Sequence, residues 1–494
     1  MRSHLKFGLL AALTAAALPL FNSHADTFRR HQDHVLGTSF DLVVTASSAE
    51  AADAAEDAIL AEIDRLNDVF SLYKPSELRR LNDADRLIVS DDLVTVWTVC
   101  ESYREQTGNA LSCRIGDLTA AWQDAEATQT VPSRPDLRLR AGETRRAEIG
   151  LDTSINQITR PNAVRFDMNA LAKGYILDAA LTAGRKAAPE ADGVLVNIGG
   201  DIRAWGEGPH DGAWSVAVTD ASELADGASA PAGALRIRSG AIAASGQGPR
   251  DREIAGQAFG HVISPADGWP VAHVRAASVY APTAIEADAL ATALMVMELK
   301  SGLSYIASQP GIEAEVVTAD GRRHATSGWS ALQIRPEEQG SEGAGWPEGK
   351  RLDVALTIPE QDTADYERPY VAVWIADPRR NLVRILMLAG DESRWMEENY
   401  FWYRRFALKA GSLVDAVAGP TRRPGRYDLQ WDGLTDDGQT VPPGGYILHV
   451  EAAREHGGHQ RSSHAFTLSE APFSATIPAG EELGEIEIRF GGAK

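Results

Sequence analysis

Helix-like and strand-like patterns of apolar residues alternate along the first two thirds of the chain. Apolar residues recur three and four positions apart in residues 48–71 and 284–297, which predicts two amphipathic helices. Short apolar runs bounded by glycine predict strands at residues 37–46, 193–206, 212–218, 233–245 and 261–268. The stretch FDMNALAKGYILD, Phe166 to Asp178, is expected to begin as a strand and to continue as a helix. Because the two patterns mix without a strict βαβ repeat, we expect an α+β fold from about Val35 to Pro336.

The pattern changes after a segment that has little to bury. RPEEQGSEGAGWPEGKR, residues 335–351, is rich in Gly, Glu and Pro and is typical of a linker. Beyond it, short alternating apolar runs separated by turn residues predict an all-β, immunoglobulin-like sandwich, with one helical segment around Trp395 to Ala407. The expected organisation is a leader at residues 1–25, an α+β domain at 26–335, a linker at 336–351 and a β-sandwich at 352–494.

The leader prediction depends on the first 25 residues. Arg2 and Lys6 precede an apolar run from Phe7 to Phe21, and the segment ends in a small-x-small pattern at Ala25. This is typical of a cleaved secretory signal peptide. A membrane anchor is the alternative, but the run is shorter than the roughly 20 residues that a spanning helix needs. We therefore expect a periplasmic protein.

Charge and cysteine content narrow the possible partners and metals. The formal net charge of -21 argues against nucleic-acid binding, since phosphates would meet a field of their own sign. Cys100 and Cys113 are the only cysteines, so a zinc site built on cysteine is excluded by count. They either form one disulfide or lie separately as small core residues.

Two pairs of polar residues in apolar surroundings are candidates for chemistry. Asp288 and Thr292 lie four residues apart on a predicted helix and offer hard oxygen ligands on one face. The alternative is an aspartate in an N-terminal turn and a threonine that bonds its own backbone. Lys173, next to a glycine, fits a phosphate partner, although a salt bridge on a helix surface explains it equally simply.

Other signals are weaker. NIGGD, Asn197 to Asp201, allows a close approach of the backbone to a ligand. His261 lies beside a turn, where it either acts as a general base or only caps the turn. The chain has no GxxxxGK[ST], HExxH or GxSxG motif, so nucleotide-loop, zinc-protease and serine-hydrolase readings have no support.

Taken together, eight ordered blocks resemble the ApbE-type flavin transferases, enzymes that move FMN from FAD onto a threonine or serine of a partner protein. The blocks are LGTSF, FSLYKPSELRRLN, TGNALSC, FDMNALAKGYILD, LVNIGGDIRAWG, AIAASG, HVISPADGWPV and ADALATAL. They cover roughly residues 30 to 335. The resemblance implies FAD as the substrate, Mg²⁺ as the cofactor, and acceptor flavoproteins of periplasmic or membrane redox systems as partners.

The resemblance also implies roles for individual residues. A magnesium ion would take the carbonyl of Ala170 and the side chains of Asp288 and Thr292, an oxygen-only set that suits this metal. His261 would assist the chemistry, as would Asp288. Contacts to FAD are implied for Leu36, Tyr73, Ala110, Leu111, Ser112, Asp167, Lys173, Asp178 and Val262.

The chain departs from the family pattern at three places: Leu111-Ser112 replaces Phe-Asp, Ala244 replaces a threonine, and Asn169 replaces a small residue. A non-catalytic flavin-binding or redox partner protein, and an FAD pyrophosphatase of the same fold, are therefore alternatives.

The second domain adds two candidates. DAVAGPT, Asp415 to Thr421, has the D-x-x-x-G-x-T frame of the segments that these transferases modify, so Thr421 is a possible FMN acceptor; an ordinary turn before a strand is the alternative. A cluster of histidines near the end suggests either a metal site or a solvated hairpin loop: His449, His456, His459 and His464.

Overall fold

The computed structural model of the protein describes most of the chain, and all statements below refer to these residues: 26–161, 164–209, 212–219, 231–247, 251–334, 350–359, 370–378, 382–389, 416–418, 425–435, 441–442, 444–454, 458–468, 471–480 and 482–492. The leader, most of the linker, the segment from Trp395 to Ala407 and Thr421 lie outside them. No helix among the described residues is long and apolar enough to cross a membrane.

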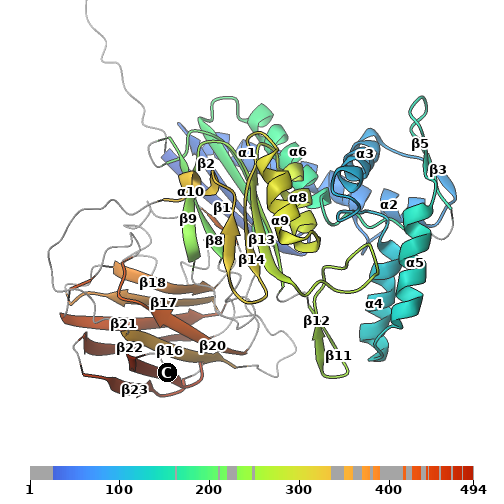
Figure 1. Cartoon of the computed structure of the whole chain (residues 1–494). Coiled ribbons are helices and arrows are strands. Elements are labelled where there is room, and N and C mark those ends of the chain that lie inside the picture. The colour runs from blue at the N-terminus through green and yellow to red at the C-terminus, as the bar shows by residue number, and fades with distance from the viewer. Residues whose placement is uncertain are drawn as a thin grey trace, which may run out of the picture.

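An antiparallel sheet forms the centre of the first part of the chain (Figure 1). Its strands, in spatial order, are β1 (Asp26–Val35), β2 (Thr38–Ala46), β6 (Gly193–Ile198), β7 (Asp201–Gly206), β10 (Gly240–Gly246), β13 (Val274–Ala281), β14 (Glu313–Thr318) and β15 (Arg323–Ala325). β2 and β6 carry nearly continuous buried residues, as strands covered on both faces should.

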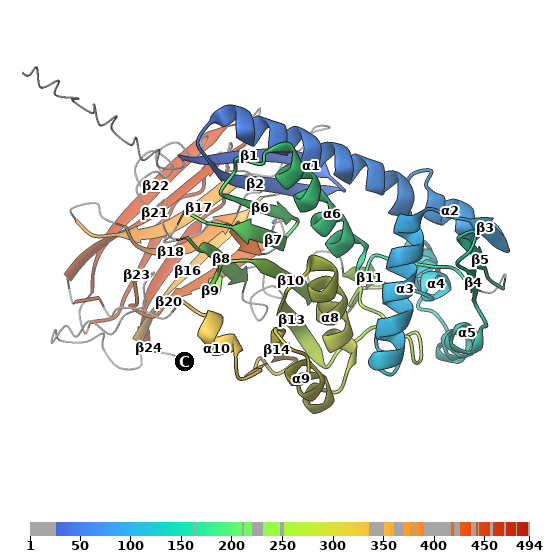
Figure 2. The same ribbon diagram turned by 90° about the horizontal axis from the view of Figure 1, so that it is seen from above.

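Helices cover one face of this sheet. They are α1 (Ala49–Phe70), α6 (Ala172–Ala187), α8 (Ala284–Val296) and α9 (Leu299–Ala307). α1 lies along α6, and α6 packs on α8, which rests on β10 and β13 (Figure 2). The α1 residues that recur at helical spacing, including Ile59, Ile63 and Leu66, are fully or almost fully buried. The opposite face is covered by the hairpin of β8 (Trp214–Thr219) and β9 (Pro231–Ile237), with α10 (Trp329–Leu332) beside it.

A smaller lobe projects from the sheet, at the end of the α+β part that lies away from the β-sandwich (Figures 1 and 2). It contains α4 (Gly116–Thr128), α5 (Arg134–Arg146) and the ribbon of β11 (Arg252–Ile254) and β12 (Gln257–Phe259), which share a core of their own. The same end of the molecule also contains α2 (Glu77–Asn82) and α3 (Asp91–Gln106), which contact α1, and the small sheet of β3 (Arg86–Ile88), β5 (Gln157–Thr159) and β4 (Gly150–Asp152).

The second part is a β-sandwich of two four-stranded antiparallel sheets, as the sequence predicts. One sheet contains β20 (Gly425–Trp431), β16 (Lys350–Ile358), β24 (Ile486–Gly492) and β23 (Phe473–Ile477). The other contains β18 (Leu382–Ala389), β17 (Tyr370–Ala376), β21 (Gly444–Ala453) and β22 (His459–Leu468). Alternate residues of both sheets join one hydrophobic cluster, which is the core between two stacked sheets.

Two of the predicted strands do not form. Residues 164–168, where FDMNALAKGYILD begins, form no strand, because the side chain of Asn82 bonds both the amide and the carbonyl of Phe166. Residues 261–268 form a turn with a single bridge between Ile263 and Pro270, and Pro270 has no amide hydrogen with which to extend a ladder.

Candidate functional site

The first turn of α6 and the helix α8 meet at Asp288. The amide of Gly174 donates a hydrogen bond to Oδ2 of Asp288 at 3.0 Å, and Asp288 is only 6% exposed. Gly174 is required for this contact, because a Cβ there would lie 2.3 Å from the carbonyl oxygen of Ala284. The absence of a side chain at this glycine therefore lets the first turn of α6, which carries Lys173, lie against the part of α8 that carries Asp288.

Thr292 lies one turn further along α8 and faces β10. Its Oγ1 is 3.2 Å from Oγ of Ser245, in the segment AIAASG. Ala170 lies in the turn that precedes α6. Asp288 thus faces the first turn of α6 and Thr292 faces β10, and the atoms that these two side chains offer to a metal are oxygens.

Lys173 and Asp178, both on α6, make different contacts. Nζ of Lys173 lies 2.7 Å from Oδ2 of Asp201, the first residue of β7. Asp178 accepts hydrogen bonds from the amides of Ala284 and Ile285, each at 3.0 Å, and pairs with Arg203 at 2.7 Å. The carboxylate of Asp178 therefore serves the N-terminus of α8, where a negative charge is favourable, and its proposed contact with FAD remains a prediction.

Asp167 is buried beside the segment that contains Cys113. Its amide donates to the carbonyl of Cys113 at 2.8 Å, and its Oδ1 accepts from the amide of Asn169 at 3.1 Å. Burial raises the pKa of the Asp167 carboxyl above its usual value, although the bonds from Asn169 and Thr119 and the charge of Arg252 oppose the shift.

The segment from Ala110 to Arg114 is held from several sides. Cys100 and Cys113 form a disulfide, which decides between the two alternatives that the sequence left open. Arg114 pairs with Glu101 at 2.6 Å and donates to the carbonyl of Ala147 at 2.7 Å. Because Leu111 and Ser112 are buried, this segment offers mainly backbone and the partly buried Ala110 to a ligand.

Tyr73 lies on the loop between α1 and α2 with its side chain unpacked. It is 83% exposed, the largest exposure among the large hydrophobic residues described. The loop itself is ordered by Ser71, whose Oγ accepts from the amides of Tyr73 and Lys74, and by Ser76, whose Oγ donates to the Ser71 carbonyl at 2.5 Å. An ordered loop with a solvent-exposed aromatic ring is suited to stacking on a planar ligand.

His261 is held by an acid that the sequence did not single out. Both its amide and its Nδ1 contact Oδ1 of Asp251, at 3.0 and 2.9 Å. With Nδ1 occupied by the carboxylate, Nε2 is the nitrogen that remains for a proton acceptor role. Val262 and Leu36 pack against the main core, and Leu36 occupies the left-handed region (φ 53°) in the turn between β1 and β2.

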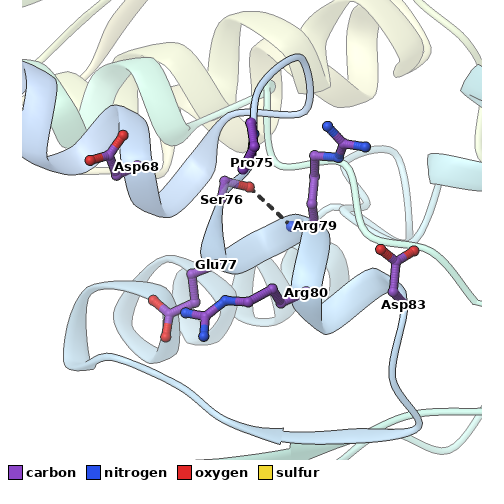
Figure 3. Close-up of a pocket in the computed structure, with 7 residues that line it drawn as sticks. All are labelled: Asp68, Pro75, Ser76, Glu77, Arg79, Arg80 and Asp83. Atoms are coloured by element: carbon purple, nitrogen blue, oxygen red, sulfur yellow. Dashed lines mark hydrogen bonds between the residues drawn. The ribbon is translucent and has the colours of Figure 1, made fainter.

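A cavity of about 530 Å³ lies at α2 (Figure 3). Its lining mixes acids and bases: Asp68, Pro75, Ser76, Glu77, Arg79, Arg80 and Asp83. Asp68 pairs with Lys74, and Glu77 bonds the amide and hydroxyl of Ser90. None of the site residues expected from the sequence lines this cavity, and its mixed lining of three acids and two arginines does not indicate a ligand.

The histidines of the second part do not form a metal site among the residues described, where no group of three or more His, Cys, Asp or Glu has suitable geometry. His449 is buried and stacks on Trp374 at 5.0 Å, and His459 pairs with the buried Glu451 at 2.8 Å. His464 lies on β22, and His456 lies outside the described residues. β21 and β22 pair as neighbouring antiparallel strands, and His449, His459 and His464 lie on these strands rather than in a solvated loop. Residues 455–457 lie outside the described part of the chain.

Comparison with known proteins gives consistent matches. FAD:protein FMN transferase of Escherichia coli (strain K12) is 25% identical over 333 residues, which cover 63% of this chain and 90% of the relative. The enzyme of the same name from Haemophilus influenzae is 29% identical over 265 residues, 51% of this chain and 74% of the relative.

Solved structures show the same fold. The ApbE protein of Thermotoga maritima superposes with a TM-score of 0.56 at 24% identity and covers 62% of this chain and 99% of its own. The apo flavinyl transferase ApbE of Pseudomonas stutzeri gives 0.53 at 21% identity, with 64% and 98% covered.

Family profiles divide the chain at the same place as its sheets do. A profile described as "Predicted periplasmic protein (DUF2271)" matches residues 351–485, the β-sandwich. The ApbE family profile matches residues 36–316, more than half of the chain, and the chain therefore belongs to the ApbE family.

Proposed function

We propose that this protein is an FAD:protein FMN transferase of the periplasm, which transfers FMN from FAD to a threonine or serine hydroxyl with the help of Mg²⁺. The observation that carries the proposal is the contact of Gly174 with Asp288, which joins the helix that carries Lys173 to the helix that carries Asp288 and Thr292. The transferase relatives and the periplasmic description of the β-sandwich family support it.

The donor set fits magnesium. Asp288 offers one carboxylate, Thr292 a hydroxyl and Ala170 a backbone carbonyl, and this hard, oxygen-only set with a single carboxylate suits an ion that keeps several waters and binds substrate phosphate. When bound, Mg²⁺ would neutralise charge on the diphosphate of FAD.

Each step of the proposed reaction can be assigned to a group of the protein. The hydroxyl oxygen of the acceptor attacks the phosphorus of the FMN half, the bond to the bridging oxygen breaks, and AMP leaves with the electron pair. Nε2 of His261 accepts the hydroxyl proton, while Asp251 holds the ring through Nδ1, as carboxylates orient histidine bases elsewhere. Lys173 stabilises the charge that builds on the phosphoryl oxygens.

The remaining groups bind FAD. Tyr73 stacks on the flavin ring, with Leu36 lining the same pocket. The backbone of Ala110, Leu111 and Ser112, together with Asp167, Asp178 and Val262, completes the contacts. Asp167 and the 110–114 segment are joined by the hydrogen bond to Cys113, which supports a common role.

The test is product analysis. The full chain is incubated with FAD, with and without Mg²⁺, and with a periplasmic extract from a bacterium that lacks its own flavin transferase. We expect AMP and covalent flavin fluorescence on an extract protein, both only with Mg²⁺. AMP with free FMN would instead identify an FAD pyrophosphatase, and flavin binding without AMP would identify a non-catalytic flavin protein.

We also propose Thr421 as an FMN acceptor within the chain. Thr421 itself lies outside the described residues. The support is β19 (Ala416–Ala418), which pairs in parallel with β8 and thereby carries its segment from the β-sandwich to the α+β part. Intact mass after incubation with FAD and Mg²⁺ tests the idea: we expect one added FMN that is lost in Thr421→Ala, and an unchanged mass would refute it.

A further inference from the structure

We propose that Asp201 is a positioning residue that fixes the ammonium group of Lys173 for contact with the diphosphate of the substrate; this rests on the proposed function. The carboxylate was not among the candidates that the sequence indicated. Its Oδ2 lies 2.7 Å from Nζ of Lys173, and the side chain of Asp201 is 4% exposed whereas that of Lys173 is 20% exposed. The acid is thus buried behind the lysine, and the lysine is the partner that reaches the surface.

The carboxylate of Asp201 has few alternative positions. Its Oδ1 accepts a hydrogen bond from the amide of Ala244 on β10 at 3.3 Å, so both of its oxygens have protein partners. Burying a charged pair costs desolvation free energy that the attraction often fails to recover. A pair of this kind is therefore better explained by the need for a fixed ammonium group than by stability.

The turn before Asp201 is fixed as well. Ile198 pairs with Asp201 across a two-residue Gly-Gly turn in which both glycines have positive φ, 55° and 91°. A side chain at Gly199 would meet Oγ1 of Thr38 at 2.5 Å. The glycines of NIGGD thus form the tight turn that starts β7 at Asp201.

A line of hydrogen bonds stabilises this turn from β6. Asn197 accepts from the amide of Gly200 at 3.0 Å and donates to Oδ2 of Asp41 at 3.0 Å. Oδ1 of Asp41 lies 2.7 Å from Nδ1 of His31, whose side chain is 1% exposed. Because the side chains of Asn197 and His31 are buried, these hydrogen bonds hold the turn that precedes Asp201 independently of the lysine.

Equilibrium binding tests the proposal without any need for turnover. The full chain and the variants Asp201→Asn, Asp201→Glu, Lys173→Met and Asp201→Asn/Lys173→Met are titrated with FAD, and binding is followed by the quenching of flavin fluorescence. We expect Lys173→Met to weaken binding about ten- to one-hundredfold, as the loss of a charge-assisted hydrogen bond does. Asp201→Asn should weaken it in the same direction, and Asp201→Glu should restore part of the loss.

The double variant separates positioning from a general structural role. If Asp201 acts through Lys173, the double variant binds FAD no more weakly than Lys173→Met alone, because the two changes remove one interaction. Asp320→Asn is the matched control, since it removes the acid of an ion pair with Arg322 on an exposed turn and should leave binding unchanged.

Two results would overturn the inference. Tighter FAD binding by Asp201→Asn would mean that the acid only reduces the positive potential that Lys173 offers to the diphosphate. Additive losses in the double variant would mean that Asp201 acts independently of Lys173. Failure of the unmodified chain to bind FAD would refute the proposed function itself, and the inference with it.

Discussion

The amide of Gly174 lies 3.0 Å from Oδ2 of Asp288, so the acid on α8 is held by the first turn of α6. A methyl group at residue 174 would lie 2.3 Å from the carbonyl oxygen of Ala284 and 2.7 Å from Cα of Ile285, and both are backbone atoms that move only with α8. We expect Gly174→Ala to lower the free energy of unfolding by about 1–3 kcal/mol through overpacking.

The same variant should reduce AMP release from FAD more than stability alone explains, because the two helices that carry Asp288 and Lys173 are forced apart. Thermal unfolding and AMP release are measured together. Gly425→Ala, where a Cβ would meet no atom within 4 Å, is the control. Full activity of Gly174→Ala would contradict the importance of this close approach.

Removing only the charge of Asp288 tests the proposed metal site. Asp288→Asn keeps an oxygen that accepts the bond from Gly174 but loses the single carboxylate of the donor set. We expect at least a hundredfold rise in the Mg²⁺ concentration needed for AMP release, with little change in the unfolding temperature. Glu286→Gln makes the same change two residues earlier on α8, where the acid accepts a hydrogen bond from Thr283, and should titrate as the unmodified chain does.

Tyr73 should contribute to FAD binding without contributing to folding. At 83% exposure it buries almost nothing in the free protein, whereas stacking of an aromatic side chain on a base is worth about 1–3 kcal/mol. Tyr73→Ala should therefore raise the Kd for FAD about five- to one-hundredfold in a fluorescence titration, and Tyr73→Phe should not. A similar rise in Ile88→Ala, at another exposed apolar side chain, would show that the effect is not specific.

The repeating patterns of the chain were sufficient to predict most of its elements. α1 and α8 match the predicted helices, and β2, β6, β7, β8 and β10 match predicted strands, because burial at a fixed period is a local property of the sequence. The strand predicted at the start of FDMNALAKGYILD does not form, because the backbone of Phe166 bonds the side chain of Asn82, which lies more than 80 positions away in the sequence. No local pattern reports such a partner.

The candidate site was predicted in part for the same reason. Spacing on one helix identified Asp288 and Thr292, but Asp201, Ser245 and Asp251 become visible only when β7, β10 and the segment at 251 fold against α6, α8 and His261. Asp178 is the opposite case. The sequence indicated it as a contact for FAD, but in the structure its carboxylate pairs with Arg203 and with the N-terminus of α8. In the sequence, Asp201 could be noticed only as the last residue of the motif NIGGD. Its role is indicated by the ion pair with Lys173, which only the structure shows.

The disulfide between Cys100 and Cys113 should stabilise the segment that contains residues 110–112. Its sequence separation is 13, and closing a loop of that size contributes about 3 kcal/mol by the chain-entropy argument. We expect Cys100→Ala/Cys113→Ala to unfold at a lower temperature and to bind FAD more weakly. Unfolding of the unmodified chain in a reductant should shift in the same direction, while the double variant should be insensitive to the reductant; equal unfolding temperatures for both proteins would contradict the role.

Asp167 makes the stability of the α+β part depend on pH in a defined direction. Burial raises the pKa of this carboxyl, so the unfolded chain loses its proton first as the pH rises above about 4. The folded state is then progressively disfavoured until the pH exceeds the raised value. Asp167→Asn does not titrate, and its amide oxygen can still accept from Asn169.

The difference in unfolding temperature, variant minus unmodified chain, should therefore become more positive as the pH rises above about 4. Asp320 gives a comparison of the opposite sign, because hydrogen bonds from Arg322 and Thr318 lower its pKa, and its contribution to stability is present at neutral pH and lost in acid. A difference for Asp167→Asn that is constant with pH, or that falls as the pH rises, would show that the buried carboxyl is not the group that resists ionisation.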